Sequence, residues 1–143
     1  PPAVPRPACA QIAIPSATAA PGALISPPSS LAIITVTSAD NGATVFLNTG
    51  QHLVVEDGFP GPAASTGTPQ GADMYWDVPS APSPGPLYLE GSRTCPGGSA
   101  VAVYAAVGTG GSTVTATTDA PCLHAQPPCE LAQQGIAIYV VVR

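Results

Sequence analysis

Residues 31–56 read "LAIITVTSADNGATVFLNTGQHLVVE", and this stretch decides the fold because apolar and polar side chains alternate in it three times. A two-residue period places every second side chain on the same face of an extended chain. The runs at 31–37, 43–48 and 52–56 therefore predict strands with one buried face. Asn41-Gly42 separates the first two runs and predicts a hairpin turn, since both residue types tolerate positive φ.

The same alternation continues towards the C-terminus, interrupted by loops rich in glycine and proline. Further strands are predicted at 73–78, 87–90, 100–107, 113–118 and 136–142. Long loops are predicted at 57–72, 79–86 and 119–135, and a turn is predicted at 91–99. Because no segment has a 3.6-residue apolar period, we expect almost no helix. Short strands with turns every 8–12 residues or so indicate an all-β chain folded as an immunoglobulin-like antiparallel β-sandwich of about seven or eight strands.

The two-residue period also predicts which side chains share a face in three of these strands. Val101, Val103, Ala105 and Val107 share one face, and Val114 and Ala116 are predicted to point inward. In the last strand one face carries Ile136, Ile138, Val140 and Val142, and the other carries Ala137, Tyr139 and Val141.

Two domains are predicted: an extended arm, residues 1–30, rich in proline and alanine, and the sandwich, residues 31–143. The prolines of the arm exclude helix. Its apolar segments "AQIAI" and "GALIS" predict packing against a sheet edge, and a floppy linker is the alternative. The arm could add a strand to its own sheet or to that of a neighbouring copy, which would make the protein self-assembling.

Composition excludes several classes of function. Only 8% of the 143 residues are charged, Lys and Arg together number 3, and the net charge is −5. So few cations cannot neutralise phosphates, which excludes nucleic acid and an anionic membrane surface as partners. No apolar run reaches the roughly 18 residues that a membrane helix requires.

The four cysteines, Cys9, Cys95, Cys122 and Cys129, indicate disulfides and an oxidising compartment. Three pairings exist, and the favoured one joins Cys122 to Cys129 across a short loop and Cys9 to Cys95. A zinc site using His124 with the two flanking thiolates is the alternative, but the spacing is too wide for a structural site. With an opening "PPAVPRPAC" typical of a mature chain, we expect a secreted or cell-surface protein, for example of a bacterial envelope.

We expect no enzyme, no cofactor and no metal, because the residues that could do chemistry are few. His52 and His124 are expected to face solvent. Asp73 and Asp77 share one face of a strand, which makes a carboxylate pair conceivable, although rim residues facing water are the favoured interpretation. Of the adjacent Tyr75 and Trp76, one should be core and the other exposed, and a lone tryptophan in a sandwich is usually a core residue.

Residues 31–143 resemble the chagasin-like inhibitors of papain-type cysteine proteases. The resemblance is carried by "TVTSADNGATVFLNTGQHLVV" (35–55), "YW" (75–76), "AVYAAVGTGGSTVTATT" (102–118) and "IAIYVVVR" (136–143). It implies an immunoglobulin-like sandwich with three inhibitory loops. Candidate binding residues in those loops are Ser65, Thr66, Gly67, Tyr75, Trp76, Gly97, Gly98, Leu123 and His124.

The chain departs from that family at two of the three loops. The family's N-P-T-T-G-Y loop is reduced to Ser65-Thr66-Gly67 and Tyr75, and its R-P-W loop is replaced by "APCLHAQPPCEL". The leading hypothesis is therefore a secreted, non-enzymatic interaction or structural module that binds a protein partner or its own copies. The alternatives are a chagasin-type protease inhibitor and a carbohydrate-binding module that uses Trp76 with the half-exposed tyrosines Tyr88, Tyr104 and Tyr139.

Overall fold

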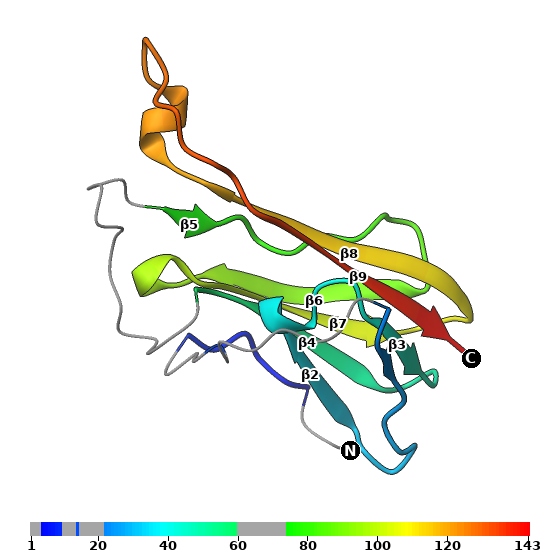
Figure 1. Cartoon of the computed structure of the whole chain (residues 1–143). Coiled ribbons are helices and arrows are strands. Elements are labelled where there is room, and N and C mark those ends of the chain that lie inside the picture. The colour runs from blue at the N-terminus through cyan, green and yellow to red at the C-terminus, as the bar shows by residue number, and fades with distance from the viewer. Residues whose placement is uncertain (1–3, 10–13, 15–21, 60–73) are drawn as a thin grey trace.

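The computed structural model describes residues 4–9, 14, 22–59 and 74–143, and these form a two-layer β-sandwich (Figure 1). The strands are β1 (Leu24–Ile25), β2 (Ile33–Thr37), β3 (Thr44–Leu47), β4 (His52–Asp57), β5 (Tyr75–Trp76), β6 (Leu87–Thr94), β7 (Ala100–Ala106), β8 (Gly110–Asp119) and β9 (Gly135–Val142). The helical elements of this part of the chain are short 3₁₀ turns, η1 (Ser38–Asp40), η2 (Pro96–Gly98) and η3 (Pro121–His124). No helix among them is long and apolar enough to cross a membrane.

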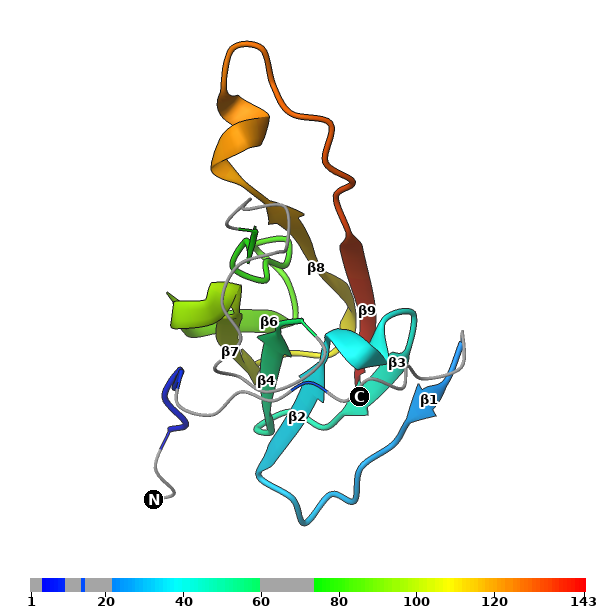
Figure 2. The same cartoon turned by 60° about the vertical axis from the view of Figure 1, so that its left-hand side comes forward.

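The two layers are a five-stranded sheet in the order β1-β3-β9-β8-β5 and a four-stranded sheet in the order β2-β4-β7-β6. Figure 2 shows the two layers from a second direction. The predicted all-β sandwich is confirmed, but the expectation of purely antiparallel pairing is wrong. β1 with β3, β2 with β4, and β3 with β9 are parallel pairs.

The hairpin predicted at Asn41-Gly42 is also wrong. The turn exists, with Gly42 at φ +85°, but β2 and β3 on either side of it belong to different sheets. Thr37 caps η1 in a capping box with Asp40, and this 3₁₀ turn carries the chain from one sheet to the other. The Asn41 side chain then accepts a hydrogen bond from the Ala137 N–H at 2.9 Å, which ties the crossover to β9.

The core between the sheets is built from the alternating apolar residues that the sequence predicted. Every second residue of β9 is buried, namely Ile136, Ile138, Val140 and Val142. Val114 and Ala116 of β8 point inward as expected. Each large aliphatic side chain buried here contributes about 1.5–3 kcal/mol relative to exposure.

In β7 the apolar face formed by Val101 and Val103 turns away from the interior. The interior is instead lined by alanines and by Tyr104, which was expected to be half-exposed but is buried. The Tyr104 hydroxyl donates a hydrogen bond to the Pro79 carbonyl oxygen at 2.9 Å. Neighbouring alanines leave the room that this large side chain needs.

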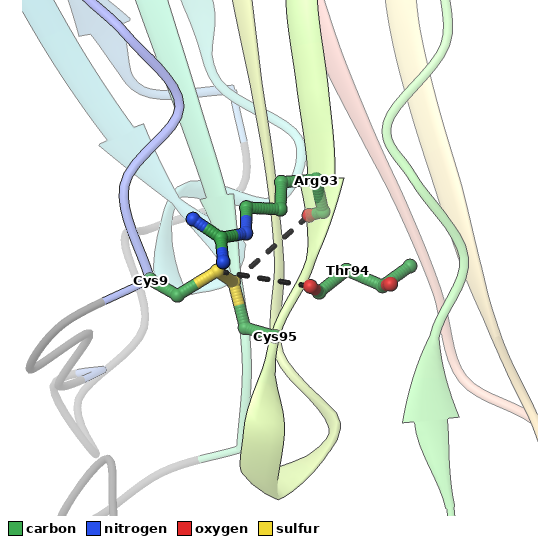
Figure 3. Close-up of a disulfide and its surroundings, with 4 residues drawn as sticks. All are labelled: Cys9, Arg93, Thr94 and Cys95. Carbon is green, nitrogen blue, oxygen red and sulfur yellow. Dashed lines mark hydrogen bonds between the residues drawn. A yellow bond between two sulfur atoms is a disulfide. The ribbon is translucent and has the colours of Figure 1, made fainter.

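The described parts of the arm pack on their own sandwich. Ile14 is buried against Val101 and Val103, and β1 pairs with β3. Cys9 forms a disulfide with Cys95, next to the end of β6 (Figure 3). The two sulfur atoms lie 3.7 Å and 3.9 Å from the carbonyl oxygens of Thr94 and Arg93, contacts without a hydrogen bond because a disulfide carries no proton.

Candidate functional site

Four connections begin at the same end of the sandwich: β2–β3 (38–43), β4–β5 (described at 58–59 and 74), β6–β7 (95–99) and β8–β9 (120–134). Strand register explains why they meet. Ala100 lies opposite both Asp57 and Thr94, so β4 and β6 end at one level. Tyr75 lies opposite Asp119, so β5 begins where β8 ends. We call the described residues 58–59, 74–75, 95–99 and 119–134 the loop end, which lies on the left in Figure 1.

The β6–β7 connection, which we call the middle turn, is a narrow glycine turn. Gly97 and Gly98 both have positive φ, at 83° and 85°, a conformation that glycine adopts without strain. The Cys95 N–H donates to the Ser99 carbonyl oxygen at 2.8 Å and closes the turn. Because a Cβ at Gly98 would collide with the Met74 carbonyl oxygen and approach Phe59 to 3.1 Å, the turn fits only without a side chain there.

The β8–β9 connection, which we call the cystine loop, projects beyond the sheets as the orange segment of Figures 1 and 2. The Cys122–Cys129 disulfide closes its tip, and the Cys129 N–H donates to the Cys122 carbonyl oxygen at 2.9 Å. At its base the Gln134 N–H donates to the Thr118 hydroxyl oxygen at 2.7 Å. The loop is therefore fixed at both ends.

A polar cluster joins the cystine loop to β5. The ring Nε2 of His124 lies 2.9 Å and 2.8 Å from the two carboxylate oxygens of Asp119. The Ala120 N–H donates to Asp119 Oδ1 at 2.8 Å. These bonds, the first from His124, lower the pKa of Asp119. Desolvation, and then the carboxylates of Asp119 and Asp77, raise the pKa of Tyr75.

A buried carboxyl group lies directly behind the β4–β5 connection, and the sequence analysis overlooked it. Asp57 is on the same face of β4 as the core residues Leu53 and Val55 and is 0% exposed. Neither of its oxygens has a hydrogen-bond partner among the described residues. Burial raises the pKa of Asp57 to about 7. The signal was present in the two-residue period, which places residue 57 on the inner face.

The predicted binding residues do not all reach the loop end. Gly97, Gly98, Tyr75, Leu123 and His124 lie there. Trp76 does not, because it is 2% exposed and packs on Phe59 in the core with ring centroids 6.2 Å apart. Its predicted role in binding is therefore wrong. Ser65, Thr66, Gly67 and Asp73 lie outside the described residues.

The residues of the alternative zinc site make other contacts in the structure. Cys122 and Cys129 are bonded to each other, and the His124 Nε2 faces Asp119. His52, on the outer face of β4, lies 3.4 Å from Glu90.

Neither a protein-family model nor a curated protein sequence matches the chain. Among solved structures it is similar to the cysteine protease inhibitor EhICP2 from Entamoeba histolytica, with a TM-score of 0.53 and 13% identity over 80% of this chain and 98% of that one. Amebosin, with a TM-score of 0.42, is 13% identical over 78% of this chain and 97% of that one. PbICP-C, solved in complex with falcipain-2, has a TM-score of 0.40 and 13% identity over 85% of this chain and 100% of its own length. The first of these similarities shows that the chain has the chagasin-like, immunoglobulin-like fold that the sequence resemblance implied.

Proposed function

We propose that this chain is a non-enzymatic inhibitor of papain-like cysteine proteases and that it binds them through the loop end. The observation that carries the proposal is that the glycine turn, the cystine loop and the described ends of the β4–β5 connection lie at one end of the sandwich. The fold shared with an inhibitor of cysteine proteases supports it. This function was the alternative in the sequence analysis, and the geometry favours it over the interaction module described there.

The geometry suits occlusion of a protease cleft. The glycine turn at 95–99 presents backbone without side chains at Gly97 and Gly98, so it can approach a narrow cleft closely. The cystine loop stands beside it and contacts the wall of the cleft. Because a disulfide and hydrogen bonds already fix this loop, little conformational entropy is lost on binding.

The contacts would differ from those of chagasin-like inhibitors with an Arg-Pro-Trp loop. The cystine loop presents half-buried Leu123 and exposed His124 in that place. We therefore expect the chain to inhibit papain-like proteases, but to prefer different members of that class.

Other functions find less support in the described residues. Cys9, Ile14 and β1 are engaged by their own sandwich, so their contacts give less support to an arm that adds to a neighbouring copy. The buried Trp76 cannot stack on a sugar. Two disulfides indicate an oxidising compartment, so we propose an extracellular target.

The test is an inhibition assay of the oxidised chain against a panel of papain-like proteases, with trypsin as the unrelated control. We expect reversible, competitive inhibition with a constant below about 1 µM. Leu123→Ala should weaken it by about tenfold. Val107→Ala is the matched control, because Val107 is an exposed apolar residue that follows β7 at the opposite end of the sandwich. No inhibition across the panel, or equal inhibition by both variants, would count against the proposal.

A further inference from the structure

We infer that Asp119 is a positioning residue that holds the cystine loop in place beside the start of β5. The structural part of this inference stands alone. Its consequence for binding rests on the proposed function.

Asp119 directly precedes the cystine loop. It is the last residue of β8 and lies opposite Tyr75, the first residue of β5. Its carboxylate accepts from the Ala120 N–H and from His124 in η3. Its negative charge, from the strand position opposite Tyr75, helps to raise the pKa of Tyr75. One side chain thus links the start of the cystine loop to its 3₁₀ turn.

The β6–β7 connection contacts the start of β5 through packing and not through charged groups. Gly98 of the middle turn lies against the backbone of Met74 and Tyr75. Tyr75 therefore lies next to the middle turn through its main chain and pairs with Asp119 in the strand register. Loss of the Asp119 carboxylate would free the cystine loop while leaving the middle turn in place.

The contact between Asp119 and His124 is the main bond that holds the 3₁₀ turn of the cystine loop to β8. The hydrogen bonds from His124 and from the Ala120 N–H lower the pKa of Asp119. The carboxylate therefore stays ionised in mild acid and remains an acceptor for both donors.

A contact of this kind contributes little to global stability, because the His124 side chain is 67% exposed. The thermal midpoint of unfolding would therefore change little when this contact is lost. Local opening of the cystine loop reports the contact directly, since it depends on the few bonds that hold the loop in place.

The test is hydrogen exchange of the amides at 120–134 in the full, oxidised chain, corrected for intrinsic rates. Asp119→Asn should accelerate exchange about threefold or more. His124→Gln keeps a side-chain donor for the carboxylate and should accelerate exchange less than Asp119→Asn does. The matched control is Glu130→Gln, which removes one charge from the same loop at an exposed residue that makes no hydrogen bond or ion pair with the rest of the described chain.

Unchanged exchange in Asp119→Asn, or equal acceleration in Glu130→Gln, would overturn the inference. A second arm measures dissociation from a papain-like protease, where Asp119→Asn should dissociate about threefold faster. If the unmodified chain binds no such protease, the proposed function fails and the exchange data still decide the role of Asp119. If the chain binds and Asp119→Asn dissociates at the same rate, the consequence for binding is refuted.

Discussion

Gly98 lies directly against the backbone of Met74, so the turn that precedes β7 and the residue that precedes β5 meet with no room for a side chain. The contact joins the β6–β7 connection to the last residue of the β4–β5 connection. It also explains why a glycine with φ +85° occupies this position.

Gly98→Ala is therefore expected to destabilise the fold by about 1–3 kcal/mol, from backbone strain and from the collision with Met74. Gly108→Ala is the matched control, because nothing lies within 4 Å of a Cβ at Gly108. Urea unfolding measures both. Equal stability of the two variants would show that the turn can move away from β5 without cost.

A second expectation concerns the carboxyl group of Asp57. Its pKa in the folded chain is raised from 3.8 to about 7, so between these values the native state holds a proton that the unfolded state has lost. Stability must therefore fall as the pH rises from about 4 to about 7, by up to about 4 kcal/mol. Above pH 7 the contribution becomes constant.

Asp57→Asn should remove most of this slope and raise the stability at pH 8, because an amide is neutral at every pH. Unfolding free energies at pH 5 and pH 8 measure the effect, with Asp77→Asn as the control at an exposed carboxylate. A slope that persists in Asp57→Asn would assign the pH dependence to another group, such as the partly buried Glu56, whose pKa burial also raises.

The strand faces could be predicted from the sequence because a two-residue period depends only on the chain itself. Ile138 and Val140 of β9 are buried where the alternation put them. Gly97 and Gly98 were placed in a turn for the same local reason. Trp76 was correctly suspected as a core residue and wrongly included among the binding residues, because a lone aromatic side chain looks the same in both roles.

Other features depend on partners distant in sequence and could not be predicted locally. The alternation around Asn41 is the same whether β3 pairs with β2 or, as it does, with β9. Strand β6 runs on through 91–94, where the sequence predicted a turn, because β7 pairs with it up to Thr94. The cluster around Asp119 unites residues from β5, β8 and η3 that carry no shared motif.

A third expectation concerns the base of the cystine loop. Thr118 is fully buried, and its hydroxyl oxygen is the acceptor for the Gln134 N–H at 2.7 Å. Thr118→Val keeps the shape but leaves that N–H without an acceptor, which costs about 1–3 kcal/mol. We expect faster hydrogen exchange at 133–135 and a lower unfolding free energy, while Thr118→Ser should retain the bond. If the serine variant is the weaker of the two, packing of the methyl group matters more than the hydrogen bond.

The last expectation separates the two disulfides by what they hold. Cys9–Cys95 closes a loop with a sequence separation of 86, against 7 for Cys122–Cys129. Chain entropy alone then predicts a stabilisation of about 4.6 kcal/mol for the first and about 2.5 kcal/mol for the second.

Serine replacement of Cys9 and Cys95 should therefore cause the larger loss in unfolding free energy, whereas replacement of Cys122 and Cys129 should cause the larger loss in protease affinity. The arm is anchored at the edge of the sandwich, but only the cystine loop lies where the proposed target binds. Unfolding in urea and inhibition constants measured on the same two variants test this division. The reverse order in both measurements would place the binding surface on the arm instead of the loop end.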